Sequence, residues 1–139
     1  DLREDVRVEG IDIRKLFSAL NERIEVLLGR DYMLGHSYFM GLSNDSKIEE
    51  LATIIENSVI PLLQEYFYDD WQRISWVLNG QIVKKKNGKN IENIFPNMSD
   101  SSQITDNRWV IDTKAFSLPN TYKNIISAET SFIDEDTRE

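Results

Sequence analysis

The sequence predicts a mainly helical fold, followed by a smaller β-containing part towards the C-terminal end. Apolar residues recur at steps of three and four over most of residues 11–80, which is the spacing of amphipathic helices. After residue 80 this periodicity fades into short β-like stretches and polar loops. The chain has 139 residues, of which 40% are hydrophobic, so it has enough apolar material for a folded core.

The clearest predicted helix lies between Asp12, a suitable N-cap, and Gly29, a suitable C-terminal cap. Seven apolar residues fall on one stripe of this helix: Ile13, Leu16, Phe17, Leu20, Ile24, Leu27 and Leu28. The stripe predicts the face that packs against the rest of the core.

Three polar residues flank this stripe. Asn21 lies on one shoulder, whereas Arg23 and Arg30 lie within about 20° of each other on the opposite shoulder. An aligned arginine pair can reach a phosphate or a carboxylate of a neighbouring body. The simpler interpretation is an ion pair of Arg30 with Asp31 beside an exposed Arg23, and the residue chemistry alone slightly favours it.

A second long helix is predicted to begin at a capping box made by Ser46 and Glu49. Pro61 is unfavourable inside a helix but suits a first turn, so we expect a break near Ile60 and a restart at Pro61. A further helix is expected to end at Asn79-Gly80.

Beyond Gly80, the segments Gln81–Lys86 and Asn90–Phe95 are predicted to be β-like pieces around an Asn87-Gly88 hairpin turn. Trp109-Val110-Ile111 is typical of a strand, and Asn120 is expected to cap a short helix. Between these elements we expect a mobile polar loop over residues 98–107, and at the end a frayed acidic tail.

Charge and composition exclude several classes of protein. The formal net charge is −8, which disfavours a broad nucleic-acid surface, and Lys84-Lys85-Lys86 with Lys89 is interpreted as a solvated turn. The chain has no cysteine, so disulfides and thiolate metal sites are excluded. No apolar run is long enough to span a membrane, and the charged start is not a signal peptide, so we expect a cytoplasmic protein without membrane partners.

The search for catalytic motifs is largely negative. The sequence has no phosphate loop, no nucleophile elbow and a single histidine, His36, so multi-histidine metal sites are impossible. A hydrolase would have His36 activate Ser37, but adjacent residues rarely hold that geometry. A helix start, with His36 or Ser37 as cap and with Tyr38 and Phe39 packed below, is the simpler interpretation. Asp69-Asp70 is likewise interpreted as a helix cap, not as a metal site.

Four segments, taken in order and spacing, resemble the C-terminal part of McrB-type proteins, which are AAA+ GTPase motor subunits of modification-dependent (5-methylcytosine-specific) restriction systems. These segments are Leu20-Asn21-Glu22-Arg23-Ile24, Arg30-Asp31, Gly35-His36-Ser37-Tyr38-Phe39 and Ile60–Tyr68. The resemblance is close over about residues 11–80 and looser from there through Trp109-Val110-Ile111 and Tyr122–Ile126.

This resemblance implies a division of the chain. Residues 1–10 would lead in from a missing AAA+ core, 11–80 would form a helical AAA+ lid subdomain, and 81–139 an α+β C-terminal extension. The family's phosphate loop, magnesium-binding acids and inter-subunit arginines precede this region, so no catalytic residue, metal ligand or cofactor is expected in the chain itself. The parent would bind GTP or ATP with Mg²⁺.

The resemblance also implies site residues and partners. Gly35, His36, Ser37 and Tyr38 occupy the place of the AAA+ sensor-2 element and would border the nucleotide, although a sensor-2 arginine is missing. Asn21, Arg23 and Arg30 would contact the nucleotide or an adjacent subunit. The expected partners are the chain's own AAA+ core, neighbouring protomers in a ring, expected to be a hexamer, an McrC-type nuclease subunit, and DNA through other domains of the parent.

Two alternatives stay open at this stage. The chain could be a stand-alone helical interaction or adaptor module without enzymatic activity, or a small hydrolase that uses His36. The sequence upstream of Asp1 would separate the first alternative from a motor subunit, because only the motor requires a phosphate loop there.

Overall fold

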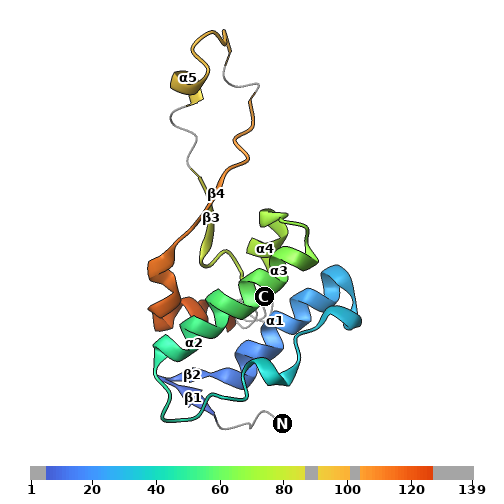
Figure 1. Ribbon diagram of the computed structural model, residues 1–139, viewed down its shortest axis with the longest axis vertical. Helices are drawn as coiled ribbons and strands as arrows, with labels where there is room; N and C mark the ends of the chain where they lie inside the picture. The colour runs from blue at the N-terminus through green and yellow to red at the C-terminus, as the bar shows by residue number, and fades with distance from the viewer. Residues whose placement is uncertain (1–5, 87–90, 101–103, 127–139) are drawn as a thin grey trace, which may run out of the picture.

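The computed structural model describes residues 6–86, 91–100 and 104–126. Figure 1 shows a helical body from which a narrow arm projects. The elements of the body are β1 (Arg7–Val8), β2 (Ile11–Asp12), α1 (Ile13–Leu28), η1 (Arg30–Tyr32), η2 (His36–Tyr38), α2 (Ile48–Ile54), η3 (Ile55–Val59), α3 (Ile60–Tyr66), α4 (Trp71–Val77), η5 (Thr113–Ser117) and a last helix over 119–126. The arm contains β3 (Val83–Lys85), α5 (Ile91–Ile94) and β4 (Trp109–Ile111). The predicted mainly helical fold with a small β-containing part is therefore confirmed.

Helix α1 begins and ends where the sequence predicts. The carboxylate of Asp12 accepts a hydrogen bond from the Lys15 N–H at 3.1 Å. At the other end Gly29 adopts a φ of 104°, and its N–H donates to the carbonyl of Glu25 at 2.9 Å. The predicted apolar stripe is buried up to Ile24 and partly buried at its last two residues.

The predicted capping box of the second helix is wrong by one residue. Helix α2 begins after Lys47, whose N–H donates to the carboxylate of Glu50 at 2.9 Å, so Glu49 has no part in the cap. The Ser46 hydroxyl instead accepts from the Ser43 N–H at 2.9 Å. Ser46 thus stabilises the turn before the helix and not the helix itself.

The turn between β1 and β2 provides a second cap for α2. The carboxylate of Glu9, in that turn, accepts from the Ile48 N–H at 2.7 Å. Val6, Val8 and Ile11 are buried beside it. The start of the described chain is therefore fixed to the helical body by both packing and a hydrogen bond.

The predicted break near Ile60 is wrong. The backbone stays helical from Ile48 to Tyr66, and the five residues before Ile60 form a π-helical turn, η3. A proline lacks an N–H, and its ring presses on the preceding turn. A wider turn before Pro61 is a known way to absorb this misfit without ending the helix.

The predicted ends of α4 are confirmed. The carboxylate of Asp70, and not that of Asp69, accepts from the Arg73 N–H at 3.3 Å. The helix stops where Asn79 and Gly80 adopt φ values of 53° and 74°. Both residue types tolerate this left-handed conformation better than most others.

The arm differs from its prediction in its strand pairing. Strand β3 pairs antiparallel with β4, with Val83 opposite Ile111, so the predicted strand at Trp109-Val110-Ile111 is confirmed. The predicted β-like piece Asn90–Phe95 is wrong where it is described, because Ile91–Ile94 is helical. Residues 98–100 and 104–107 contain no helix or strand, as expected for the predicted loop. Its residues 101–103, the Asn87-Gly88 turn and the acidic tail lie outside the described residues.

The C-terminal helix begins earlier than predicted. It covers residues 119–126, so Asn120 lies inside its first turn and does not cap it. Proline suits the first position of a helix because its φ is already helical and its missing N–H would have no partner there. Pro119 therefore explains the earlier start.

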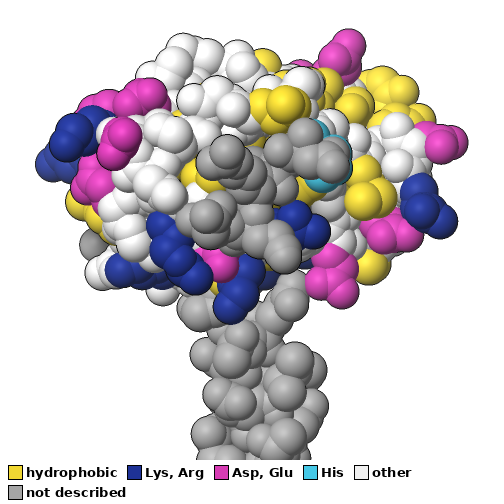
Figure 2. All heavy atoms as spheres, turned by 90° about the horizontal axis from the view of Figure 1, so that it is seen from below, with side chains coloured by type: hydrophobic (Ala, Val, Ile, Leu, Met, Phe, Trp, Pro, Cys, Tyr) yellow, Lys and Arg dark blue, Asp and Glu magenta, His cyan; other side chains and the backbone are white. Residues whose placement is uncertain are grey.

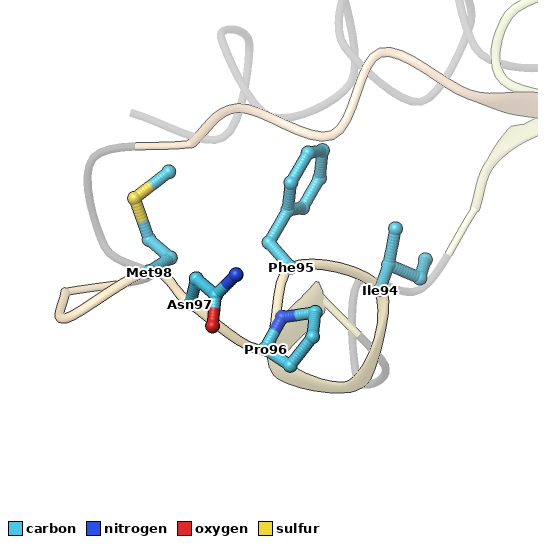
Figure 3. Close-up of a pocket in the computed structure, with 5 residues that line it drawn as sticks. All are labelled: Ile94, Phe95, Pro96, Asn97 and Met98. Carbon is cyan, nitrogen blue, oxygen red and sulfur yellow. The ribbon is translucent and has the colours of Figure 1, made fainter.

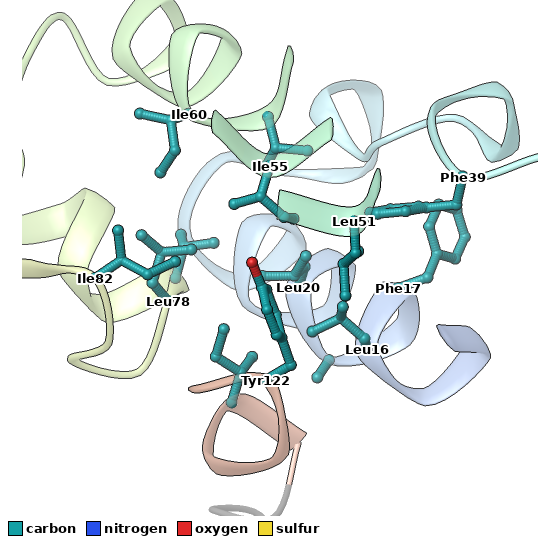
Figure 4. Close-up of a cluster of buried hydrophobic side chains, with 14 of the residues drawn as sticks. Leu16, Phe17, Leu20, Phe39, Leu51, Ile55, Ile60, Leu78, Ile82 and Tyr122 are labelled. Carbon is teal, nitrogen blue, oxygen red and sulfur yellow. The ribbon is translucent and has the colours of Figure 1, made fainter. Parts of the chain in front are cut away.

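One hydrophobic core joins these elements, as Figure 4 shows. The ring of Tyr122, from the last helix, enters the cluster among side chains such as Leu20 and Ile55 and is fully buried. Its hydroxyl donates to the carbonyl of Phe116 at 2.7 Å. The division of the chain at residues 10 and 80 stays a prediction, but side chains from before residue 11 and after residue 80 share this core.

Tyr122 should make the stability of the fold depend on pH in the alkaline range. Burial, and to a smaller degree the charge of Glu56, raises the pKa of Tyr122 far above its ordinary value of 10.0. Above pH 10.0 the folded state therefore keeps the phenol protonated while the unfolded chain ionises. The stability that this group contributes is complete below pH 10.0 and is lost as the pH rises towards the pKa of the folded state. We expect the free energy of unfolding, measured with urea, to fall more steeply above pH 10.0 in the wild type than in Tyr122→Phe.

At neutral pH, Tyr122→Phe should cost about 1 kcal/mol, because the Phe116 carbonyl loses its donor. Tyr68→Phe is the matched control, since the Tyr68 side chain is 91% exposed. Equal alkaline slopes for wild type and Tyr122→Phe would contradict this account of the buried phenol.

Candidate functional site

The candidate site lies on the segment that returns along α1 after Gly29. This segment contains the turns η1 and η2 and is held to α1 by Asn21. The Asn21 side-chain amide donates to the carbonyl of Leu34 at 3.0 Å, and its oxygen accepts from the Leu34 N–H. Asn21 is only 4% exposed, so it fixes the residue directly before the predicted sensor-2-like cluster.

The cluster of Gly35, His36, Ser37 and Tyr38 lies at the surface around η2. His36 and Ser37 are exposed, and Tyr38 is half-buried. The imidazole of His36 lies over Phe17 of α1, with ring centroids 5.0 Å apart. Figure 2 shows His36 at the surface beside hydrophobic side chains. The cluster thus presents an imidazole and two hydroxyl groups on a firm aromatic support.

That support is Phe17, whose ring meets the fully buried ring of Phe39 edge-on with centroids 5.7 Å apart. The predicted helix start at this point is a single 3₁₀ turn, and the predicted cap by His36 or Ser37 is wrong because neither side chain caps it. The turn is instead held by Asn21 and by the packing of Phe39. Its polar side chains are therefore not used as caps and can face a ligand or a neighbouring surface.

The side chain of Arg23 forms hydrogen bonds within the chain. Its guanidinium donates to the carbonyl of Val77, at the end of α4, at 3.1 Å and to the carbonyl of Ile125, in the last helix, at 2.8 Å. Arg30 points elsewhere: its side chain is 86% exposed and lies 3.9 Å from the carboxylate of Glu25. The two arginines therefore do not form one joint surface, and the expected ion pair of Arg30 is made with Glu25, not with Asp31.

Beside the cluster, two tyrosines meet in a contact that the sequence does not indicate. The ring of Tyr32, in η1, meets that of Tyr66, in α3, edge-on with centroids 5.1 Å apart. Burial raises the pKa of Tyr66 most, and the nearby Tyr38, Glu65 and Tyr32 raise it further. Helical periodicity marks Tyr66 as a core position, but no local signal shows that a turn more than thirty residues earlier covers it.

The described residues were also searched for metal ligands and membrane helices. Among residues 6–86, 91–100 and 104–126, no group of three His, Asp or Glu side chains could hold a metal ion. Within the same ranges, no helix is long and apolar enough to cross a membrane.

Comparison with protein families identifies part of the helical body. Residues 12–75 match the family described as McrB, alpha-helical lid domain. These residues are an McrB-type lid domain. The matched range contains every predicted site residue, from Asn21 to Tyr38. No curated protein matches the chain.

Within the McrB-type lid, the roles of the predicted site residues toward a nucleotide or a neighbouring subunit stay predictions. The structure adds the supports that sequence reasoning missed, namely the double hydrogen bond of Asn21 and the two carbonyl contacts of Arg23. The one signal for them in the sequence was an asparagine beside the apolar stripe, because a buried side-chain amide requires hydrogen-bond partners within the protein.

Replacing Asn21 should loosen the η2 cluster of the McrB-type lid. Asn21→Ala leaves the N–H and carbonyl of Leu34 without partners, so we expect a loss of about 2 kcal/mol in the free energy of unfolding. Hydrogen exchange should become faster at the Leu34 amide. Glu22→Ala, at the exposed neighbouring position, is the control and should change stability by less than about 0.5 kcal/mol. Unchanged exchange at Leu34 in Asn21→Ala would show that this contact does not hold the segment.

Proposed function

We propose that the chain is the lid region of a nucleotide-hydrolysing AAA+ motor subunit in a modification-dependent DNA restriction system. The observation that carries this proposal is the match of residues 12–75 to the McrB lid domain. A lid of this kind closes on a nucleotide that a separate AAA+ core holds. In this proposal the lid borders the pocket and contributes to ring assembly but is not catalytic alone.

The η2 cluster is the part of the lid that we propose borders the nucleotide. Its support is local: His36 and Ser37 are exposed, while Asn21 and Phe39 fix the backbone beneath them. A firm turn with exposed donors can contact a ribose, a base or a phosphate oxygen without reorganising. GTP or ATP supplies the phosphoanhydride bond whose hydrolysis drives the motor.

The magnesium ion and the triphosphate require other residues. The sequence contains no phosphate loop, and the described residues contain no acidic or histidine group that could hold a metal ion. We therefore assign those ligands to the AAA+ core and leave to this chain only contacts at the pocket border. Exposed imidazole and hydroxyl groups suit such a role, because they donate or accept hydrogen bonds without carrying the charge of the metal site.

The lid is proposed to move as one rigid body. Arg23 joins α1 to α4 and to the last helix, so a rotation of α1 carries both of them. Hydrolysis would then shift the whole lid against the core and the neighbouring protomers as one body. The McrC-type nuclease partner and the DNA would be engaged by other parts of the assembly.

The test compares the chain alone with the same chain joined to its AAA+ core. We expect no measurable GTP or ATP hydrolysis by the chain alone and clear hydrolysis by the joined protein. In the joined protein, His36→Ala with Ser37→Ala should lower kcat/KM about tenfold, equivalent to the loss of one or two polar contacts. Tyr68→Ala, at a side chain that is 91% exposed and is not part of η2, is the matched control.

Turnover by the chain alone that His36→Ala abolishes would overturn the proposal in favour of a small hydrolase. An upstream coding sequence without a phosphate loop would overturn it in favour of a stand-alone interaction module.

A further inference from the structure

The arm leaves the helical body through a residue in an unfavourable backbone conformation. Ile82, directly before β3, is β-branched and has a φ of 73°. In this left-handed region Cβ lies too close to a backbone carbonyl oxygen, so glycine and asparagine adopt it far more readily than isoleucine. The Val83 N–H donates to the Gln81 carbonyl at 2.7 Å, which closes a three-residue γ-turn around Ile82. A γ-turn with a positive central φ is rare and strained.

Burial offsets this strain. Successive side chains of an extended chain point to opposite faces, yet Ile82 and Val83 are both buried in the same hydrophobic cluster, at 0% and 1% exposure. Figure 4 shows the side chain of Ile82 beside that of Leu78. The turn therefore places two consecutive side chains in the core, and their removal from water stabilises a backbone conformation that Ile82 would not adopt alone.

The second strand of the arm is attached to the same residue. The Asp112 N–H, directly after β4, donates to the Ile82 carbonyl at 2.7 Å. Beyond this bond the two strands pair with each other, beginning with Val83 opposite Ile111. A rotation of the backbone at Ile82 would therefore change the direction of both strands together.

Space for such a movement lies beside the start of α4. A polar hollow of about 240 Å³ is lined there by Asp69, Asp70 and Trp71 of the body and by Lys85 and Trp109 of the arm. Lys85 and the two aspartates carry opposite charges, so their attraction favours a closer approach of β3 to this part of the body.

The end of the arm is the part that such a movement would displace most. Figure 1 shows this end far from the helical body. Figure 3 shows that Ile94, Phe95 and Met98 extend there to the same side of the chain, and they are 49%, 45% and 43% exposed. Exposed apolar side chains gathered in one place are typical of a contact surface. The backbone conformation at Ile82 therefore determines where the arm holds this surface.

We propose that Ile82 is a latch for the arm. In the latched state, which is the one described above, the γ-turn is closed and the arm projects. In the released state Ile82 returns to a negative φ, its side chain leaves the core, and β3 and β4 lean towards the start of α4 and close the hollow. Release relieves backbone strain but exposes one isoleucine side chain, and these opposing terms are similar in size. A contact made by the arm can therefore shift the balance between the two states.

The strained turn is tested by the order of stability of two variants. Ile82→Gly and Ile82→Ala both remove the isoleucine side chain, but only glycine adopts a positive φ without strain. We expect the urea midpoint of Ile82→Gly to lie above that of Ile82→Ala. Ile24 is the matched control, because it is equally buried but lies within α1, where alanine should be more stable than glycine. A higher midpoint for Ile82→Ala than for Ile82→Gly would overturn the strained turn and the latch with it.

The movement is tested by the position of the arm in the full chain. The chain has no cysteine, so two spin labels can be attached at Asn97→Cys, at the end of the arm, and at Trp76→Cys, on α4. Pulsed electron paramagnetic resonance then measures the distance between the labels. We expect one main distance in the chain with Ile82, and in Ile82→Ala a second, shorter distance whose population is at least about three times larger, because the variant keeps the strain but loses the buried anchor. Ile82→Val, which loses a single methyl group, should shift the distribution in the same direction by less.

A distance distribution that stays the same in Ile82→Ala and in Ile82→Val overturns the latch. An equal shift in Ile24→Ala also overturns it, because any loss of core packing would then release the arm. So does a broad distribution without a second distance, which would show an arm that bends without two states. The inference does not rest on the proposed motor function, and the measurement needs no nucleotide, so a failure of that function would not alter its result.

Discussion

One guanidinium group connects three helices that lie far apart in the sequence. Arg23 of α1 donates to carbonyls that are 54 and 102 residues further along the chain, at the end of α4 and in the last helix. Helix ends leave carbonyl groups without partners, and a positive charge is favourable there. The apolar stripe of α1 packs into the core, and Arg23, on the shoulder of that stripe, joins α1 to α4 and to the last helix.

This constraint attaches the chain after residue 80 to the helical body. Tyr122 is fully buried in the core, and Ile125 both packs there and accepts the hydrogen bond from Arg23. Strand β4 leads directly into η5 and the last helix, so the root of the arm is attached to elements that the core holds. In the proposed motor, a rotation of the lid would therefore carry the arm with it. The same helix also holds the proposed pocket border, because Asn21 fixes the segment that contains the η2 cluster.

Local sequence patterns predicted the elements that are determined by residues near one another in the sequence. The cap at Asp12, the left-handed Gly29 and the apolar stripe between them lie within one helix, and all are visible in the sequence. The partner of β3 was missed because it lies more than twenty residues away, beyond a stretch that itself suggests a hairpin. The helix across Pro61 was missed because propensity argues against proline, whereas tertiary packing of the flanking apolar residues keeps the chain helical through a π turn. The site residues were predicted by resemblance and stay predictions, whereas the hydrogen bonds of Asn21 and Arg23 depend on which backbone groups the fold brings near.

The most direct test of this account is hydrogen exchange of the helix over 119–126 in Arg23→Met, which keeps much of the apolar length of arginine but removes its donors. Arg30→Met, at a side chain 86% exposed, is the matched control. The account predicts that Arg23→Met lowers the free energy of unfolding by about 2–3 kcal/mol and selectively speeds exchange in this last helix. Slow exchange there in Arg23→Met, equal to that in Arg30→Met, would contradict the claim that Arg23 holds the C-terminal part to the lid.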